Sequence, residues 1–408
     1  MAEIFPLEVY RYSDLNALPK LSFPLMPKEE FGPDMDAFYT VPFHSILLTY
    51  PKTAPGKTPL FQEWKEHNIV VREKASVYKY IQKYVHPVSG KPFLRTGIMV
   101  ALKVGEWGPE NVLPHEAINK DVVEQGIQFL EHYQVNSSPI HLLYEDADNS
   151  FRKFLEYPTT QVMAFTDTQG TLHRLEKFDK NVFPVLKNLF KTGPLFLADG
   201  HHRYQTMLLY NKKHGTHVPI PAYISLIEQE PDTLLPFHRM IKLSDFKEEI
   251  LLNLLKRFFE LKPVSRESVE KFTSQSEEGE WGLLLKSQSF ILKPISEKVK
   301  HFISHKAYNE ARQKMAFIDY LVLKYLENFI KEQPKNWYNL KFSYNFTKLS
   351  NKVQSGEADF GLLLKGVTMS TLKQTVLKNS ILPEKSTFFY PKMQAGMFFY
   401  DLTDIKLK

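Results

Sequence analysis

The sequence has 408 residues, of which 43% are hydrophobic and 24% are charged, a composition typical of globular proteins with a sizeable core. At roughly 150 residues per domain, this length predicts two to three domains. The net charge of +6 is modest and spread along the chain, so nucleic-acid binding, which needs a dense basic face, is not expected. The absence of cysteine excludes disulfides, thiolate nucleophiles and cysteine-based zinc sites.

The sequence shows neither a signal peptide nor a membrane-spanning segment. The first residues, Met-Ala-Glu-Ile-Phe-Pro-Leu-Glu, lack the basic and apolar regions of a signal peptide. No apolar run approaches the roughly 20 residues that a membrane span needs. We therefore expect a soluble, cytoplasmic protein without a membrane partner, and the sequence leaves its oligomeric state open.

The first part of the chain alternates strands and helices. Hydrophobic periodicity and turn residues predict short strands at 9–11 and 45–49, a helix at 59–68, strands at 76–81 and 97–104, a helix at 120–133, strands at 139–144, 162–165 and 170–175, a helix at 183–191, a strand at 195–198, a helix at 204–214, and strands at 221–227 and 234–239. The turn Asp167–Gly170 should join two of these strands as a hairpin. This order predicts an α/β or α+β fold.

From Leu243 the pattern changes, and we place a domain boundary there, giving domains 1–242 and 243–408. The predicted elements are an amphipathic helix at 245–260, a hairpin at 281–285 and 289–293, a long helix at 308–332, and strands at 343–349, 359–365 and 397–402 around a helix at 369–379. The second domain is thus expected to be a smaller α+β domain.

One stretch concentrates the chemistry of a binding site. The apolar run Leu195–Ala198 breaks at Asp199-Gly200 and continues as His-His-Arg into a helix. Because the first turn of a helix has unpaired N–H groups and a positive dipole end, this pattern predicts an anion site. Gly200 lets a ligand approach the main chain, and Arg203 offers a planar fork for phosphate or carboxylate oxygens.

Each residue of this stretch also has a simpler interpretation. Asp199 and Gly200 could form only a turn and helix cap. His201 and His202 are adjacent, so their side chains diverge; one could be structural while the other contacts phosphate or transfers a proton. Arg203 needs an anionic partner if it is buried, either a ligand or an internal Asp or Glu.

Three further segments could contribute to the same site. His115-Glu116 is either a capping pair or a site element in which Glu116 is the general base for a hydroxyl nucleophile. His238-Arg239 is either a polar strand end or a second anion clamp. A basic loop near the C-terminus is either solvated or part of a substrate site; its candidate residues are Lys385, Ser386, Thr387, Tyr390 and Lys392.

Several familiar catalytic templates are missing from the sequence. It contains no G-x-x-x-x-G-K-[ST] phosphate loop and no G-x-G-x-x-G after a strand. H-E-x-x-H and G-x-S-x-G are absent too. The remaining chemistry is phosphate handling by main-chain N–H, His, Arg and Lys, with a carboxylate base.

Four motifs in order resemble the bacterial family catalogued as domain of unknown function 1015: Val112-Leu-Pro-His-Glu116, Ala198-Asp-Gly-His-His-Arg-Tyr204, Leu235-Pro-Phe-His-Arg239 and Pro383-Glu-Lys-Ser-Thr-Phe-Phe-Tyr-Pro-Lys392. The Gly200–Arg203 core also resembles the nucleotide-binding motif of the ParB/sulfiredoxin-like superfamily, which includes free serine kinases. The resemblance implies a mixed-sheet ParB/sulfiredoxin-like first domain. It also implies that the second domain contributes the loop at 385–392.

Together, the anion site and the resemblance suggest a small-molecule phosphotransferase. We expect a kinase of free L-serine that uses ATP, ADP or pyrophosphate with Mg²⁺, with Glu116, His202 and Arg203 as catalytic residues. Asp199, Gly200 and His201 would help to bind the donor, while Arg239 and Lys385 would neutralise developing charge. One alternative is a ParB-like nucleotide-binding regulator; the other is a metal-dependent phosphatase that uses His115, Asp199, His201 and His238.

Overall fold

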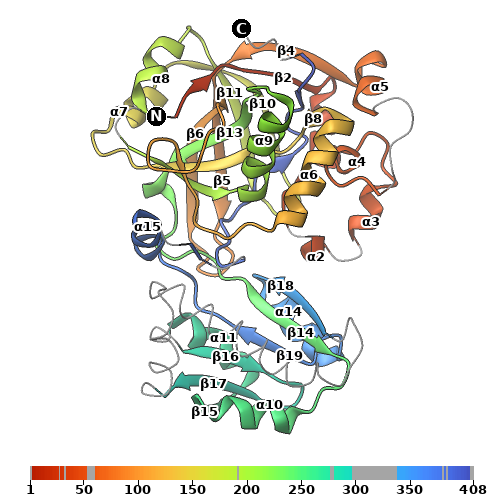
Figure 1. The fold of residues 1–408 in the computed structure, drawn as a ribbon, viewed down its shortest axis with the longest axis vertical. Coiled ribbons are helices and arrows are strands. Elements are labelled where there is room, and N and C mark those ends of the chain that lie inside the picture. Colours follow the sequence, from red (N-terminus) through yellow and green to blue (C-terminus); the bar gives the residue numbers. More distant parts are fainter. Residues whose placement is uncertain are drawn as a thin grey trace. The chain divides into compact units, whose positions relative to one another are not determined.

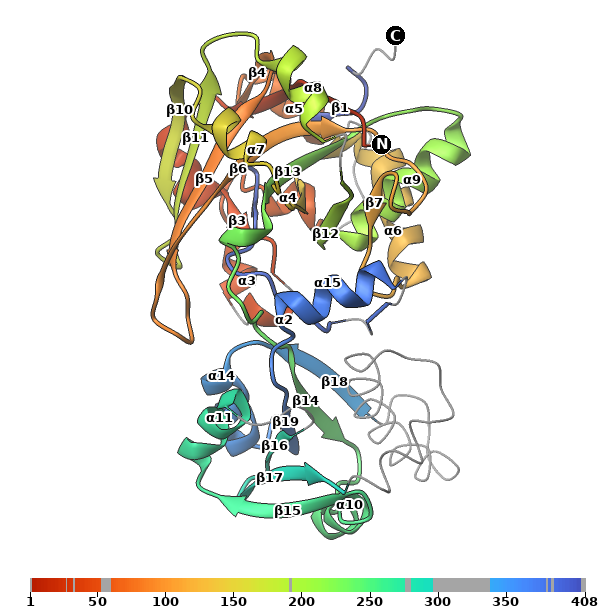
Figure 2. The same ribbon diagram turned by 90° about the vertical axis from the view of Figure 1, so that its left-hand side faces the viewer.

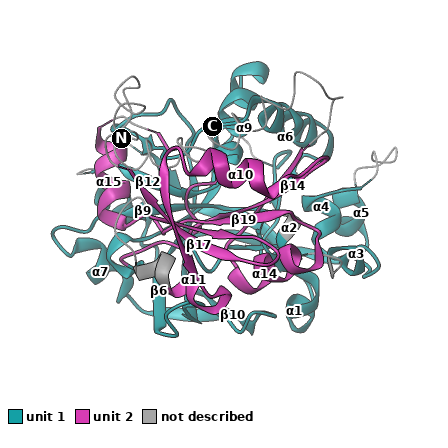
Figure 3. Ribbon diagram, turned by 90° about the horizontal axis from the view of Figure 1, so that it is seen from below, with its two compact units in different colours: residues 1–231, 389–408 teal, residues 232–388 magenta. Residues whose placement is uncertain are grey.

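The computed structural model describes residues 2–404 except 27, 32–33, 53–59, 191–192, 276–279, 296–337, 379–380 and 383–384. Its contacts divide the chain into two compact units, coloured in Figure 3: unit 1 comprises Met1–Pro231 with Phe389–Lys408, and unit 2 comprises Asp232–Phe388. The first part of unit 1 therefore ends at Pro231, before the predicted boundary at 242. Unit 1 also includes the C-terminal segment Phe389–Lys408, which was predicted to belong to the second domain. The predicted helix at 308–332 lies outside the described residues.

Within the described residues, unit 1 is built on a nine-stranded sheet with the order β10-β11-β5-β6-β13-β9-β12-β7, and β1 also pairs with β6 (Figure 1). The strands are β1 (Ile4–Phe5), β5 (Tyr78–Val85), β6 (Pro92–Leu102), β7 (Val112–Leu113), β9 (Ile140–Tyr144), β10 (Thr159–Thr166), β11 (Leu172–Phe178), β12 (Leu195–Asp199) and β13 (Ile220–Leu226). The pairs β9–β13 and β12–β7 are parallel, and the other pairs are antiparallel.

The centre of this sheet is covered on both faces. Every residue of β9 and β13 is buried, as is typical of central strands with no solvent-facing side. The helices α6 (Lys120–Tyr133) and α9 (His201–His214) lie side by side (Figure 1). A Cβ at Gly126 of α6 would stand 2.6 Å from Thr206 Oγ1 of α9, so this glycine permits their close approach.

The two ends of the chain in unit 1 pair with each other and with its middle. Here β20 (Gln394–Ala395) pairs with β3 (Phe23–Pro24), β21 (Tyr400–Asp401) with β8 (Val135–Asn136), and β2 (Leu7–Tyr12) with β4 (Val70–Ser76). The other helices are η1 (Leu15–Ala17), α1 (Leu18–Leu21), α2 (Lys28–Phe31), α3 (Asp34–Phe38), α4 (Ile46–Thr49), α5 (Leu60–Glu66), α7 (Ser150–Leu155), α8 (Phe183–Leu189) and η2 (Ile227–Gln229).

Most predictions for this unit agree with the structure, and one is wrong. The helix expected at 120–133 is α6, and the hairpin expected around Asp167–Gly170 is β10–β11. The strand expected at 45–49 is instead the short helix α4, which buries Ile46 and Leu48. An apolar run of this length fits either a short strand or a helical turn, so its periodicity alone does not decide between them.

Unit 2 contains an antiparallel sheet with the order β15-β17-β16-β19-β14-β18. Its elements are β14 (His238–Leu243), α10 (Glu248–Leu255), β15 (Phe259–Val264), α11 (Arg266–Gln275), β16 (Trp281–Leu284), β17 (Ser289–Pro294), β18 (Tyr338–Ser343), α14 (Phe346–Ser355), β19 (Phe360–Leu363) and α15 (Met369–Leu377). Its neighbouring strand residues alternate between two core clusters. Leu283 belongs to the cluster that contains Leu251 of α10, and Leu284 to the cluster that contains Val269 of α11 and Leu349 of α14. Helix α10 accordingly lies on one side of the sheet, and α11 and α14 lie on the other (Figure 2).

Three predicted elements of unit 2 differ from the structure. The strand expected at 234–239 begins only at His238, because β14 spans His238–Leu243. The strand expected at 343–349 ends at Ser343, because Asn345 caps α14 by accepting a hydrogen bond from Lys348 N–H at 2.9 Å. The helix expected at 245–260 covers only Glu248–Leu255, because Phe259 starts a strand that pairs with β17. The predicted α/β (α+β) class is confirmed in both units, whereas the ParB/sulfiredoxin-like assignment stays a prediction.

Candidate functional site

The predicted anion motif lies at the end of a buried strand. Leu195 to Ala198 of β12 are buried between β9 and β7. The register with β9 shifts between Leu197 and Asp199, which brings Asp199 opposite His141. Such a bulge redirects a side chain at a strand end. The bulge in β12 therefore places the Asp199 carboxylate at the start of helix α9.

Gly200 makes the turn from this strand into the helix. It has a left-handed conformation with φ 100°, and helix α9 starts at the next residue rather than at Tyr204 as the sequence suggested. The first hydrogen bond within the helix is donated by Tyr204 N–H to Gly200 O at 2.9 Å. The amides of residues 201–203 therefore form the positive end of the helix dipole beside Asp199.

We expect Gly200→Ala to destabilise unit 1 clearly. The new Cβ would stand 2.6 Å from Ile140 Cγ2 and 3.2 Å from the Arg203 guanidinium carbon, and the positive φ adds strain. The matched control is Gly215→Ala at the other end of α9, where φ is 63° and no atom lies within 4 Å of the Cβ position. Chemical denaturation should show a loss that exceeds the control by at least about 1 kcal/mol. Equal losses would mean that space at Gly200 is unimportant.

Two cations share the carboxylate of Asp199. One oxygen accepts from the Arg203 guanidinium and the other from the Lys392 ammonium. Arg203 also donates to the carbonyls of Ser138, at 3.1 Å, and Pro139, at 2.5 Å. Burial alone would raise the pKa of Asp199, but Lys392 and Arg203 hold that pKa below its usual value. We call Asp199, Arg203 and Lys392 the Asp199 cluster.

The Asp199 cluster has a net positive charge. Lys392 is almost completely buried, and the cluster contains two cations against one anion. The neighbouring histidines His115, His141 and His201 do not change this charge. Burial lowers the pKa of His115 to about 4 and the pKa values of His141 and His201 well below the usual range, so all three are neutral at pH 7. Two cations beside the N-terminus of a helix suit an anionic ligand such as phosphate or carboxylate.

The segment before helix α6 lies against the start of α9. His115 N–H donates to His201 Nε2 at 3.1 Å, and Asn119 N–H donates to His202 Nε2 at 3.0 Å. His115 Nδ1 is 2.7 Å from Leu197 O, to which it donates as the neutral tautomer. Glu116, the predicted general base, is half-buried in this segment.

The structure divides the predicted site residues between the two units. Unit 1 brings His115, Asp199, Gly200, His201, His202, Arg203 and Lys392 together, and it also contains Glu116 and Tyr390. In unit 2, His238 Nδ1 accepts from Leu364 N–H at 3.2 Å, and Arg239 donates to Phe237 O at 2.8 Å. Lys385 lies over the Phe237 ring, and Ser386 and Thr387 are buried.

Metal coordination by the described residues would need several ligand side chains close together. These residues contain no group of three or more His, Asp or Glu side chains arranged to hold a metal ion. Of the residues that the phosphatase alternative names, His115, Asp199 and His201 belong to unit 1 and His238 belongs to unit 2. No helix in the described part of the chain has the length and apolar character to cross a membrane.

No sequence pattern indicated the side chain that fixes the segment before Lys392. Arg95 is completely buried and donates to both oxygens of Glu230 at 2.6 Å. Its other N–H groups donate to Gln82 Oε1 at 2.9 Å and to the carbonyls of Tyr390 and Pro391 at 2.8 and 3.1 Å. All five donors of the guanidinium are thus used. The only available signal was a charged residue within a strand.

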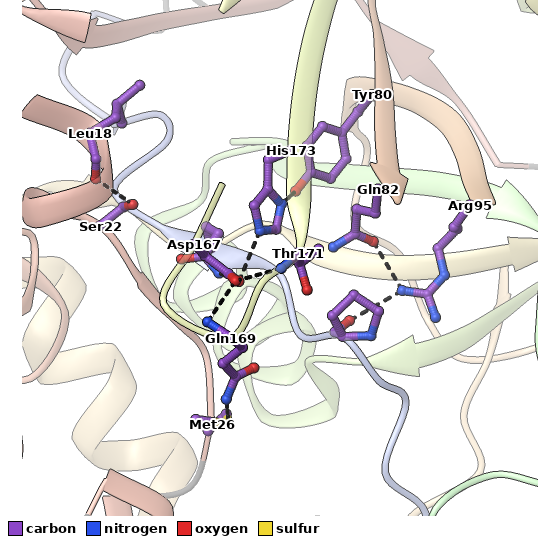
Figure 4. Close-up of polar contacts among 12 residues, drawn as sticks. Leu18, Ser22, Met26, Tyr80, Gln82, Arg95, Asp167, Gln169, Thr171 and His173 are labelled. Carbon is purple, nitrogen blue, oxygen red and sulfur yellow. Dashed lines mark hydrogen bonds and ion pairs between the residues drawn. The ribbon is translucent and has the colours of Figure 1, made fainter. Parts of the chain in front are cut away.

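A second buried polar chain holds the other side of the same segment (Figure 4). Tyr80 Oη and His173 Nδ1 are 2.6 Å apart, and His173 Nε2 lies 3.0 Å from Asp167. The same oxygen of Asp167 accepts from the Gln394 amide at 2.8 Å. The main chain on both sides of Lys392 is therefore anchored to the sheet, which places its ammonium at Asp199.

These features define an α/β protein with a partly buried cluster of two cations and one carboxylate at a strand-to-helix turn. The model of the family described as "Protein of unknown function (DUF1015)" matches residues 57–320, and the chain belongs to this family. The comparison with curated protein sequences gives no match.

Solved structures with some similarity include a free serine kinase in complex with AMP, with 13% identity, a TM-score of 0.38, and coverage of 70% of this chain and 88% of that one. A conserved hypothetical protein from Pyrococcus furiosus has 14% identity, a TM-score of 0.39, and coverage of 72% and 97%. SbnI with a C-terminal truncation, from Staphylococcus aureus, has 11% identity, a TM-score of 0.39, and coverage of 71% and 84%.

Proposed function

We propose that the protein is a small-molecule phosphotransferase, and specifically a kinase that makes O-phosphoserine from free L-serine. The observation that carries the proposal is the Asp199 cluster, in which two cations share one carboxylate beside the N-terminus of helix α9. Phosphoryl transfer needs mainly positioning and charge neutralisation, and such a cluster supplies both. Serine as the acceptor rests on the resemblance of Gly200–Arg203 to the ParB/sulfiredoxin-like motif.

In the proposed reaction, the serine hydroxyl oxygen attacks the terminal phosphorus of ATP, ADP or pyrophosphate. A new P–O bond forms, the bond from that phosphorus to the bridging oxygen breaks, and the leaving group departs with its electron pair. Glu116 takes the hydroxyl proton, while Arg203, Lys392 and the first amides of α9 hold the donor phosphates. The roles of Arg239 and Lys385, which belong to unit 2, stay predictions.

Mg²⁺ enters this proposal through the donor rather than through a ready-made protein site. Both oxygens of Asp199 already accept from cations, so this carboxylate does not fit a Mg²⁺ ligand in the observed arrangement. Mg²⁺ is commonly held by substrate phosphates, one or two carboxylates and water. When bound to the donor, it would neutralise phosphate charge.

The test is a screen of donors against acceptors, read by phosphorus NMR. Purified protein with Mg²⁺, one of the three donors and L-serine should produce phosphoserine. Arg203→Met should lower the rate about 100-fold, since a charge-assisted hydrogen bond contributes roughly 1.5–3 kcal/mol. Arg152→Met is the matched control, because Arg152 is half-exposed and pairs only loosely with Glu228 at 3.5 Å.

The outcomes separate the alternatives. Phosphoserine from the wild type and Arg152→Met but not from a folded Arg203→Met supports the kinase. Nucleotide binding by calorimetry without turnover for any donor and acceptor would favour the nucleotide-binding regulator. Equal rates for the two arginine variants would remove the Asp199 cluster from the mechanism.

A further inference from the structure

The two histidines that begin helix α9 both hydrogen-bond to the main chain of one loop. The loop is 115–119, between β7 and α6, and we call it the Glu116 loop. His201 Nε2 accepts from the first amide of this loop, His115 N–H, at 3.1 Å. His202 Nε2 accepts from the last, Asn119 N–H, at 3.0 Å. The two imidazoles diverge, as those of adjacent helix residues must, but they hydrogen-bond to opposite ends of the same loop.

These hydrogen bonds fix the chemical form of both rings. An imidazole nitrogen can accept from an amide only while it carries a lone pair, so each ring has its proton on Nδ1 and is neutral. Burial of His201 favours this form, since it lowers the pKa of His201 well below the usual value. The His115 ring meets the His201 ring edge-on at 4.4 Å and donates to Leu197 O, which completes the anchor at the first end.

The second end of the loop is fixed to helix α6. Asn119 is the N-cap of α6, and its side chain accepts from Asp121 N–H at 3.0 Å. Helix α6 in turn packs closely against α9 at Gly126 and Thr206. The loop therefore runs between two elements that are both packed against their neighbours, β7 against β12 and α6 against α9.

We infer that His201 and His202 are positioning residues that hold the Glu116 loop, and with it Glu116, at the start of helix α9. The sequence had suggested a phosphate contact for one of them. Their observed hydrogen bonds instead explain why two histidines follow Gly200. The inference rests on the proposed function only for the role of Glu116 as a general base; the positioning of the loop is independent of it.

The direct test is amide hydrogen exchange followed by mass spectrometry on the full chain. His202→Leu removes the acceptor, whereas His202→Gln keeps an acceptor at similar reach. His202 is the better position to change, because it is only half-buried, whereas His201 is almost completely buried. We expect about tenfold faster exchange in residues 115–119 of His202→Leu, corresponding to the loss of one hydrogen bond, and exchange near the wild-type rate in His202→Gln.

Strand β13 provides the internal control, because its exchange should be unchanged in both variants. Unchanged exchange of the Glu116 loop in His202→Leu would overturn the inference, and so would equally fast exchange in His202→Gln. If the wild type forms phosphoserine, His202→Leu should lower kcat while the KM for the donor stays within about twofold, and His202→Gln should recover part of kcat. Failure of the proposed function would appear as absent turnover in the wild type, and the exchange result would still decide this inference.

Discussion

Replacing Arg95 with methionine should lower the free energy of unfolding by about 3–5 kcal/mol, since it leaves a buried carboxylate without its partner. Arg95 and Glu230 are both completely enclosed, and the guanidinium also satisfies one side chain and two carbonyls. Methionine keeps much of the volume but none of the donors. Because the lost contacts include Tyr390 and Pro391, the segment that places Lys392 at Asp199 should loosen as well.

Arg152→Met separates this effect from the loss of any arginine. Its ion pair with Glu228 is half-exposed, so urea denaturation should show a change below about 1 kcal/mol. The loss in Arg95→Met should also be smaller at pH 5 than at pH 7. Burial already raises the pKa of Glu230 against the opposing effect of Arg95, and without Arg95 this carboxyl will take up a proton in the folded state. A pH-independent loss of the size of the control would contradict the argument.

Local patterns were sufficient for elements whose signals lie close together in the sequence. Helix α6 has an N-cap at Asn119 and buried residues at Val123, Ile127 and Leu130, which repeat with helical spacing. The β10–β11 hairpin is fixed by its turn, where Asp167 accepts from the amides of Gln169 and Thr171. In both cases a few neighbouring residues determine the structure, so the sequence alone predicts it.

The same local view could not predict the assembly of the site. Arg203 was expected to need an anionic partner, and the structure supplies Asp199, four residues away; no pattern distinguished this partner from a ligand. Lys392 reaches Asp199 only because the chain returns to unit 1 after Phe388, and that return depends on Arg95, far away in sequence. Contacts over such separations carry no periodicity, and only the family resemblance suggested that these segments belong together.

Acid sensitivity should be the other large effect, because several histidines are buried in the neutral form. Burial lowers the pKa of His44 and of His115 to about 4 and that of His238 to about 3, each from an ordinary value near 6.5. His44 Nδ1 accepts from Ile46 N–H at 3.1 Å, as His238 Nδ1 does from Leu364 N–H. Protonation would replace each acceptor with a donor.

The sign of the effect follows from proton binding. Between pH 6.5 and about 4, the unfolded chain binds a proton at each of these histidines and the folded chain does not, so stability falls as the pH falls through this window. A shift from 6.5 to about 4 corresponds to about 3 kcal/mol per histidine once the window is crossed. Several such groups represent a large part of a typical folding free energy. Urea denaturation from pH 7.5 to 4.5 should therefore show steeply decreasing stability.

Single substitutions can assign this pH dependence to particular residues. In His44→Asn, an amide oxygen replaces Nδ1 as acceptor but does not titrate, so the stability lost between pH 7 and 4.5 should be smaller by about 2–3 kcal/mol than in the wild type. His67→Asn makes the same substitution at an exposed histidine and serves as the matched control. The contribution of Asp199 to stability can be separated from that of the histidines. Lys392 and Arg203 hold the pKa of this carboxyl below its usual value, so the stabilisation that it provides is lost only below about pH 4. Identical curves for His44→Asn and the wild type would show that His44 already carries a proton in the folded state.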